Sequence, residues 1–312
     1  MTELKDALTA WGAQHIRMIK DRENQVHEIK IKGARAALRL HRPGYMTKAE
    51  IRSELIWMAG LSDAGMDVPA PLPAQDDSTV VTLSSGRLAT VVTWVEGAPI
   101  GDGDVPFEMP VAEQISIYHK LGRELARLHN ITDTLTLPAD FTRHRWDLDG
   151  LLGDTPFWGR FWECPALNAE ERALINRARA VAHDRVQAYV ENGADFGLIH
   201  ADALRENVFI KDGAITLIDF DDAGFGFRLY DLAVMMTQNE REPAAAEIQA
   251  AAIKGYRELR AFSDEAEELL PMFIMIRRFA SMGWAVPRYE DGSVESRRYT
   301  QKAIDAAAQF LR

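Results

Sequence analysis

Residues 198–233 read LIHADALRENVFIKDGAITLIDFDDAGFGFRLYDLA, and this stretch decides the fold. It contains two strand-like runs, 207–210 and 214–218, and the Lys211-Asp212-Gly213 connection suits a tight hairpin turn with a residue at positive φ. Polar residues that a purely structural hairpin would not need flank it: His200, Asp202 and Asn207 before it, Asp219 and Asp221 after it. The pattern H-x-D-x-x-x-x-N, hairpin, D-x-D predicts a functional site built around the hairpin.

The flanking residue types fit phosphoryl transfer. This reaction needs little covalent help from the protein, but it needs magnesium held against the phosphates and an acceptor oxygen held in line. Asn207 and Asp219, brought together by the hairpin, can offer an amide oxygen and a carboxylate to a hard cation. Asp202 can accept the proton of the attacking hydroxyl. The alternative, that these residues only form turns and caps, is less favoured because both carboxylates would have to fall in register with the hairpin by chance.

The segment resembles the catalytic and metal-binding loops shared by protein kinases and the aminoglycoside phosphotransferase and choline kinase superfamily. Its IDFDDAG and YDLA parts are similar to the small-molecule branch rather than to the HRD and DFG form of protein kinases. The resemblance implies a catalytic base at Asp202, metal ligands at Asn207 and Asp219, and a helix residue, Asp231, that braces the catalytic loop through backbone hydrogen bonds. We expect His200 to organise that loop rather than to act as an acid or base.

The resemblance also implies ATP and Mg²⁺ as cofactors and a small-molecule hydroxyl substrate, such as an amino alcohol, an amino acid, an aminoglycoside or a sugar-like acceptor. Two alternatives remain at this point. One is a protein Ser/Thr kinase on the same fold, against which the chain lacks an A-P-E motif after Asp219. The other is a nucleotide-binding pseudokinase, which only an arginine at position 39 in place of the usual lysine supports.

The first hundred residues predict a small antiparallel sheet with one helix. Strands are expected at 26–31 and 36–40, joined through Gly33, and at 79–83 and 88–95. Between the two pairs, Thr47-Lys48-Ala49-Glu50 has capping-box spacing and opens an amphipathic helix to about residue 64.

The third strand and the helix carry the expected nucleotide contacts. Period two puts Ala37 and Arg39 on one face of the strand, and Glu54 projects from the apolar face of the helix. An inward carboxylate is costly unless it is paired, and Arg39 is the expected partner, although Glu54 at a solvent-exposed helix edge is the alternative. By resemblance, Arg39 contacts phosphate, Ala37 packs on adenine, and the backbone at Trp94 and Val95 forms the hinge that meets adenine. The phosphate-covering loop, Arg22-Glu23-Asn24-Gln25, has no glycine, which favours the small-molecule branch.

Helical patterns dominate after Gly97, at 111–129, 169–192, 244–262 and 263–285. The predicted fold is therefore α+β and two-lobed, like a protein kinase. Residues 1–97 form a nucleotide-binding N-lobe that ends in a hinge, and residues 98–312 form a larger helical C-lobe with the catalytic loop, the metal-binding loop and the acceptor site.

The acceptor site is less clear from the sequence. Arg205 and Arg288 can bind a carboxylate, and Asp221 and Trp284 are further candidates for acceptor contacts. An aromatic concentration suggests a cage for a quaternary ammonium group, but aromatic residues at such spacing are more often core. Its members are Trp146, Phe157, Trp158, Phe161 and Trp162.

Composition sets the remaining expectations. The formal net charge of −11 disfavours nucleic acid and anionic lipid as partners. One cysteine, Cys164, excludes an intrachain disulfide and is expected to be a buried spectator. Without a basic segment followed by an apolar run at the N-terminus, and without 18 successive uncharged apolar residues, we expect a cytoplasmic protein, no membrane contact, and a monomer or homodimer.

Overall fold

The computed structural model describes residues 2–21, 24–103 and 105–312. The chain divides into two compact units, and each is described by itself. Unit 1 comprises residues 1–100, 131–143 and 207–221, and unit 2 comprises residues 101–130, 144–206 and 222–312. The lobe boundary at residue 97 stays a prediction.

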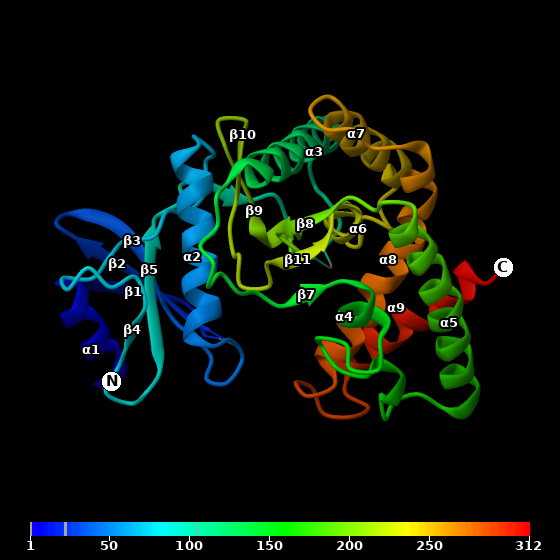
Figure 1. Cartoon of the computed structure of the whole chain (residues 1–312), viewed down its shortest axis with the longest axis horizontal. Helices are drawn as coiled ribbons and strands as arrows, with labels where there is room; N and C mark the ends of the chain where they lie inside the picture. Colours follow the sequence, from blue (N-terminus) through cyan, green and yellow to red (C-terminus); the bar gives the residue numbers. More distant parts are fainter. Residues whose placement is uncertain (1, 22–23, 104) are drawn as a thin grey trace. The chain divides into compact units, whose positions relative to one another are not determined.

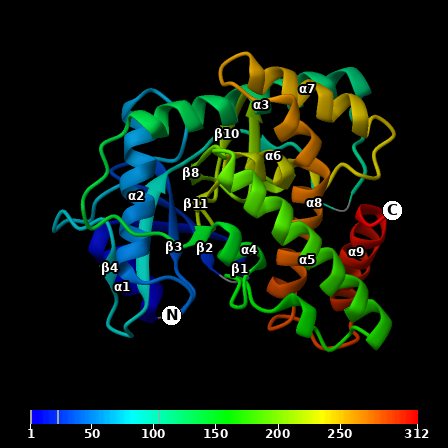
Figure 2. The ribbon, with the colours of Figure 1, turned by 45° about the vertical axis from the view of Figure 1, so that its right-hand side comes forward.

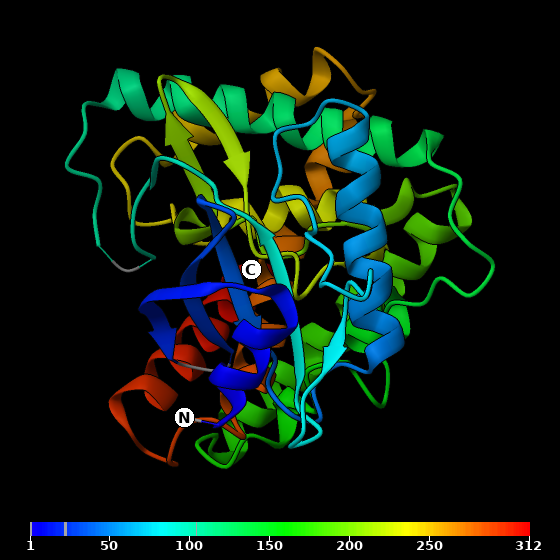
Figure 3. The ribbon, with the colours of Figure 1, turned by 90° about the vertical axis from the view of Figure 1, so that its left-hand side faces the viewer.

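Unit 1 contains a five-stranded antiparallel sheet in the order β1-β2-β3-β5-β4 (Figure 3). The strands are β1 (Gln14–Asp21), β2 (Gln25–Ile31), β3 (Ala34–Leu40), β4 (Val81–Thr82) and β5 (Leu88–Thr93). Lys32 and Gly33 connect β2 to β3 with φ of 49° and 88°, the two positive values that a two-residue hairpin turn requires. Both predicted strand pairs are confirmed.

Strand β1 was not predicted. All eight of its residues are exposed, and its pairing with β2 is irregular between His15 and Arg17 and again between Met18 and Lys20. These irregularities are β-bulges, which bend an edge strand.

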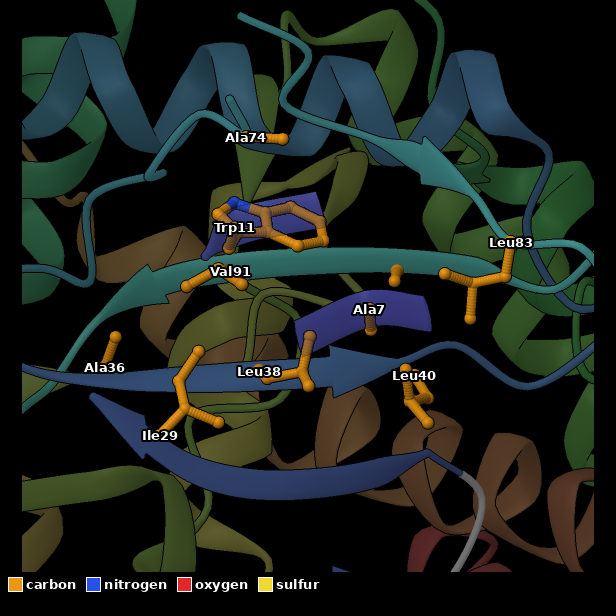
Figure 4. Packing of buried hydrophobic residues seen from close by; sticks show 10 residues of the cluster. Ala7, Trp11, Ile29, Ala36, Leu38, Leu40, Ala74, Leu83 and Val91 are labelled. Carbon is orange, nitrogen blue, oxygen red and sulfur yellow. The ribbon is translucent and has the colours of Figure 1, made fainter. Parts of the chain in front are cut away.

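One face of this sheet is covered by α1 (Thr2–Trp11), a helix that the sequence did not predict. Figure 4 shows Ala7 and Trp11 of α1 beside Leu38 of β3 and Val91 of β5. All four side chains are buried, and the Trp11 indole N–H donates to the carbonyl oxygen of Leu72 at 2.9 Å. This apolar layer fixes β3, which also carries Arg39.

The other face of the sheet carries α2 (Lys48–Asp63) (Figure 1). The predicted capping box is present, because the Thr47 side chain accepts from the Glu50 N–H and the Glu50 carboxylate accepts from the Thr47 N–H. The Trp57 indole N–H donates to the Thr132 hydroxyl at 2.9 Å, which ties α2 to the segment 131–143 of the same unit. Alternation along β3 therefore turns Leu38 toward α1 and Arg39 toward α2.

Unit 1 also contains the hairpin of β9 (Val208–Lys211) and β10 (Ala214–Leu217), joined by β6 (Ala98–Pro99) in a three-stranded sheet. Asp212 and Gly213 have φ of 50° and 78°, so the predicted tight turn is confirmed. At the start of β6, Gly97 has φ of 109°, and a Cβ there would lie 2.5 Å from the carbonyl oxygen of Ile210.

Unit 2 is mainly helical (Figure 2). Its long helices are α3 (Val111–Thr134), whose last turn belongs to unit 1, α5 (Ala169–Glu191), α6 (Arg228–Met236), α7 (Ala245–Arg257), α8 (Asp264–Ala285) and α9 (Val294–Phe310). Helix α8 packs against α6 and α9, and α9 also packs against α5. The four predicted helices correspond to α3, α5, α7 and α8, whereas α9 was not predicted.

A small sheet within unit 2 leads into the catalytic-loop segment. Its order is β7-β11-β8, with β7 (Arg145–Trp146), β8 (Phe196–Ile199) and β11 (Gly224–Phe227). The short helices α4 (Leu148–Leu152), η1 (Phe161–Glu163) and η2 (Arg205–Asn207) complete the secondary structure of the described residues. The predicted α+β class is confirmed. Within the same described residues, none of the helices is both long and apolar enough to span a bilayer.

Candidate functional site

The loop after β8 is held by a buried carboxylate of α6. Asp231 is 0% exposed, and it accepts hydrogen bonds from the backbone N–H of His200 at 2.8 Å and of Ala201 at 2.6 Å. Ala201 has φ of 62°, a region that residues other than glycine seldom occupy. The two bonds to one carboxylate hold the backbone in this conformation immediately before Asp202.

A second buried pair keeps Asp231 charged. His129 of α3 places Nε2 3.0 Å from the Asp231 carboxylate and Nδ1 2.8 Å from the Tyr256 hydroxyl. Burial alone would raise the pKa of Asp231, but His129 and the His200 backbone hold it below its ordinary value. Burial lowers the pKa of His129 to about 4, so the ring is neutral near pH 7.

The ring of His200, the residue expected to organise this loop, contacts the loop backbone. Its ring is fully buried, and its Nδ1 accepts a hydrogen bond from the backbone N–H of Asp202 at 3.2 Å. Because that nitrogen is an acceptor, the proton of the neutral ring lies on Nε2.

The carboxylate of Asp202 pairs with an arginine that the sequence analysis did not identify. Arg277 of α8 places Nη2 2.6 Å from Asp202 Oδ1 and Nη1 3.1 Å from the carbonyl oxygen of Ala201. The Arg277 side chain is 5% exposed, whereas the Asp202 side chain is 18% exposed. Arg277 thus anchors Oδ1 of Asp202, and the Asp202 side chain is still reached by solvent.

In unit 1, the β9–β10 hairpin brings Asn207 close to Asp219. The backbone N–H of Ile218 donates to the carbonyl oxygen of Asn207 at 3.0 Å. Asn207 therefore faces Ile218 across the hairpin, and Ile218 is the residue directly before Asp219. Asp219 has φ of 65° and a side chain that is 31% exposed. The donor set, one amide oxygen and one carboxylate, is the kind that a hard divalent cation prefers.

Arg39 lies at the centre of an acidic cluster within unit 1. Its guanidinium is 2.7 Å from Asp219, 3.4 Å from Asp221 and 3.8 Å from Glu54. Burial alone would lower the pKa of Arg39, but these three acids raise it above its ordinary value, so the group stays charged. Its shortest contact is with Asp219 rather than with the predicted partner Glu54.

Glu54 has a second cationic partner, Arg143. The Arg143 guanidinium lies 3.3 Å from the Glu54 carboxylate and also donates to the carbonyl oxygens of Phe220 and Asp221, at 3.3 and 2.6 Å. Glu54 is 4% exposed, which excludes the solvent-edge alternative. Burial raises the pKa of Glu54 to about 7, even though Arg143 opposes the shift. Arg143 therefore joins α2 to the Asp219–Asp221 segment.

The other expected nucleotide contacts lie nearby in unit 1. Ala37 of β3 pairs with Val92 of β5 and lies on the same face of β3 as Arg39. Trp94 and Val95 follow the last residue of β5, and the Arg35 guanidinium lies 4.0 Å from the centre of the Trp94 ring. In the glycine-free loop, Asn24 donates to the Asp221 carboxylate at 3.0 Å. Arg22 and Glu23 lie outside the described residues.

The predicted acceptor residues have different surroundings. Arg205 is 2% exposed, bonds to Asn239, Glu242 and the carbonyl oxygen of Val105, and lies 3.6 Å from the centre of the Phe107 ring. A guanidinium engaged in this way holds its own loop, which argues against the acceptor contact expected of it. Asp221, as described above, contacts Arg39 and Asn24.

Trp284 and Arg288 lie together at the end of α8. The Arg288 guanidinium is 4.4 Å from the centre of the Trp284 ring and donates to the Trp284 carbonyl oxygen at 2.7 Å. Arg277 covers Trp158 in a similar way, with 4.7 Å between the guanidinium and the ring centre. Protein cations already use these ring faces, which disfavours a cage for a quaternary ammonium ion. Trp146 and Phe161 are fully buried, as core residues are.

Across residues 2–21, 24–103 and 105–312, no three side chains of the His, Cys, Asp or Glu type gather as a metal site. A magnesium ion bound together with ATP does not need such a group, because phosphate oxygens and water supply most of its ligands.

Comparisons with known proteins identify the family of this chain. Residues 15–262 match the model of the phosphotransferase enzyme family. The solved structure of a microcompartment-associated aminopropanol kinase has a TM-score of 0.80 and 32% identity, covering 98% of this chain and 94% of that chain. An amicoumacin kinase solved with AMP-PNP, Ca²⁺ and Ami has the same fold, with a TM-score of 0.79 at 18% identity over 98% of this chain and 92% of that chain.

A further relative is the homoserine kinase of Gluconobacter oxydans (strain 621H), which is 30% identical over 236 residues, 70% of this chain and 66% of that protein. The chain therefore belongs to the phosphotransferase enzyme family, and it is an ATP-dependent kinase for hydroxyl groups of small molecules, as its sequence predicted.

Proposed function

We propose that the protein transfers the γ-phosphoryl group of ATP to the hydroxyl group of a small amino alcohol. The observation that carries this choice of acceptor is the 32% identity to an aminopropanol kinase over 98% of the chain. The homoserine kinase relative supports it, because homoserine also carries an amine and a hydroxyl. The amicoumacin kinase contributes the likeness of fold alone.

Asp202 is the proposed catalytic residue. Its carboxylate accepts a hydrogen bond from the acceptor hydroxyl, orients that oxygen and takes up its proton. A partly exposed carboxylate on a loop that Asp231 holds by two backbone bonds suits this task, because positioning supplies much of the rate in phosphoryl transfer.

Asn207 and Asp219 are the proposed magnesium ligands. When bound, the ion neutralises charge on the β- and γ-phosphate oxygens. The short hairpin that joins the two residues and the oxygen chemistry of both side chains support this assignment.

Arg39 is the proposed phosphate contact. Its guanidinium pairs with Asp219 at 2.7 Å and lies 3.8 Å from Glu54, which Arg143 holds in turn. A guanidinium in place of lysine offers two parallel N–H donors to phosphate oxygens, so the substitution changes the contact geometry and keeps the charge. Ala37 is proposed to pack on adenine, and the backbone at Trp94 and Val95 to meet its polar edge.

Three further expectations are proposals. A cytoplasmic location is supported by the one cysteine, Cys164, which is buried. We also propose the division at residue 97 into a nucleotide-binding and an acceptor-binding lobe, and a monomer or homodimer as the assembly.

A paired acceptor panel tests the proposed function. Purified protein with ATP and Mg²⁺ is offered 1-amino-2-propanol, ethanolamine and homoserine, and each is matched by an analogue without the amine, such as 1,2-propanediol for the first. The expected result is a phosphorylated product from at least one amine, with a kcat/KM about tenfold or more above that of its analogue, since leaving a polar group of the site unpaired costs about 1–3 kcal/mol and about 1.4 kcal/mol is a tenfold ratio. If none of the three amines has a higher kcat/KM than its analogue without the amine, the amino alcohol assignment is refuted.

A further inference from the structure

The environment of Arg277 carries an inference about catalysis that rests on the proposed role of Asp202. Arg277 lies in the middle of α8, a helix whose other buried residues are mainly apolar. It also lies beyond residues 15–262, the part of the chain that matches the family model. An arginine in such a position is expensive to bury, so its contacts need an explanation.

Those contacts converge on the loop of Asp202. The guanidinium donates to the Asp202 carboxylate at 2.6 Å and to the carbonyl oxygen of Ala201 at 3.1 Å, so it bridges the side chain of one residue and the backbone of the residue before it. The guanidinium carbon lies over the Trp158 ring, 4.7 Å from the ring centre. This cation–π contact and two hydrogen bonds to different groups leave the guanidinium little freedom.

The guanidinium stays charged in this environment. Burial alone would lower the pKa of Arg277, but Tyr230, Asp202 and Asp222 raise it above its ordinary value. A charged donor on a carboxylate gives a shorter and stronger hydrogen bond than a neutral donor does. The side chain of Asp202 is therefore held from α8, while its backbone is held from α6 through Asp231 and Ala201.

We propose that Arg277 is a positioning residue for phosphoryl transfer, which fixes the orientation of the Asp202 carboxylate toward the acceptor hydroxyl. It does not touch the substrate in this role and acts through Asp202. Without it, the carboxylate loses the charged donor at Oδ1 and its orientation is less restricted, so the acceptor oxygen is aligned less well with the γ-phosphate. A displacement of about 1 Å at such a group lowers turnover by roughly a hundredfold.

The test is a double-mutant cycle on kcat with Arg277→Gln, Asp202→Asn and the double variant. We expect Arg277→Gln to lower kcat by about ten- to a hundredfold, with the KM for ATP within about twofold of the wild-type value. In the Asp202→Asn background, the same change should lower kcat by less than about threefold, because the group through which Arg277 acts is already altered. Arg277→Lys, which keeps one charged donor, should recover part of the loss.

A matched control guards against a loss of fold. Arg278 is the next residue of α8, is also buried, and pairs with Glu240 and the Thr237 carbonyl oxygen instead of the loop. Arg278→Gln should leave kcat unchanged after correction for the folded fraction, which circular dichroism and thermal unfolding measure for every variant.

The outcomes separate two failures. If Asp202→Asn lowers kcat but Arg277→Gln lowers it by equal factors with and without Asp202, or not at all, Arg277 does not act through Asp202 and the inference is overturned. If Asp202→Asn itself keeps wild-type kcat, the proposed catalytic role of Asp202 fails first, and the inference falls with it. If Arg277→Gln does not fold, Arg277→Lys in the same cycle decides the question.

Discussion

Replacing Asp231 with asparagine removes one buried charge and keeps the shape of the side chain. In the wild type, three donors converge on the carboxylate: the backbone N–H groups of His200 and Ala201, at 2.8 and 2.6 Å, and the His129 ring, at 3.0 Å. An amide has one oxygen in place of two, and its NH₂ group is a donor. In either orientation of the amide, one of the two backbone N–H groups faces another donor.

The size of the effect follows from this geometry. A buried donor without an acceptor costs about 1–3 kcal/mol, and the remaining bonds lose the charge that strengthened them, worth about 1 kcal/mol. We therefore expect Asp231→Asn to lower the free energy of unfolding by about 2–4 kcal/mol. Because the lost bonds hold Ala201 at φ of 62°, kcat should fall as well, by at least about tenfold.

Urea unfolding and steady-state kinetics on the same preparations measure the two effects. Asp195→Asn is the control, because Asp195 is also an acid of unit 2 that pairs through both carboxylate oxygens, with Arg260, but its side chain is 38% exposed. That change should cost at most about 1 kcal/mol and leave kcat as in the wild type. The reasoning would be refuted if Asp231→Asn lowered the free energy of unfolding by less than about 1 kcal/mol. It would also be refuted if the expected loss of about 2–4 kcal/mol occurred while the kcat of the folded fraction stayed unchanged.

Three further predictions concern the metal ligand, the buried histidine and the turn at Gly97. Asp219→Ala should lower magnesium-dependent kcat by about a thousandfold or more, because a lost metal ligand removes several kcal/mol of charge stabilisation; a coupled ATP assay that still gives a tenth of wild-type turnover contradicts the assignment. Below pH 6.5 the unfolded chain protonates His129 while the native chain, with a pKa of about 4, does not, so acid favours unfolding. Between pH 7 and 4 the free energy of unfolding from urea titrations should fall by up to about 3 kcal/mol more for the wild type than for His129→Asn, and an equal fall in the two proteins would contradict this. Gly97→Ala should destabilise by at least about 2 kcal/mol in urea, because its φ is 109° and its Cβ would meet the Ile210 carbonyl, whereas Gly33→Ala, at φ of 88° with open space around it, should cost only about 1 kcal/mol; similar losses for the two would be inconsistent with the clash.

Local signals predicted the elements whose cause is local. The Lys211-Asp212-Gly213 connection and the capping box at Thr47 each depend on a few neighbouring residues, and both occur where the sequence placed them. The elements that were missed lack such signals. Strand β1 reads QHIRMIKD, in which Ile19 directly after Met18 breaks the alternation of apolar and polar residues that would predict a strand. Helix α9 buries only small or hydroxyl-bearing side chains, namely Ser296, Thr300, Ala303 and Ala307, so its contact face is not visibly apolar.

The same contrast applies to the candidate site. Asp202, Asn207 and Asp219 lie within one short segment, so their spacing is readable. Their supports come from distant parts of the chain: Arg277 is 75 residues from Asp202, and Arg143 is 89 residues from Glu54. The sequence around a single arginine does not indicate which distant residue it will contact. The one available signal was a charged residue within the apolar run of α8, which a burial argument could have singled out.

The irregular strand β1 has a consequence for how the protein behaves at high concentration. An edge strand whose N–H and C=O groups are not paired on one side can pair with a strand of a second molecule. Its hydrophobic side chains are also exposed: Ile16 at 41%, Met18 at 52% and Ile19 at 47%. The two bulges break the straight row of groups that an incoming strand would have to match, and the charge of Lys20 on this edge opposes pairing with an identical copy. The strand thus discourages fibre-like stacking of molecules by its shape and charge, without burying its apolar side chains.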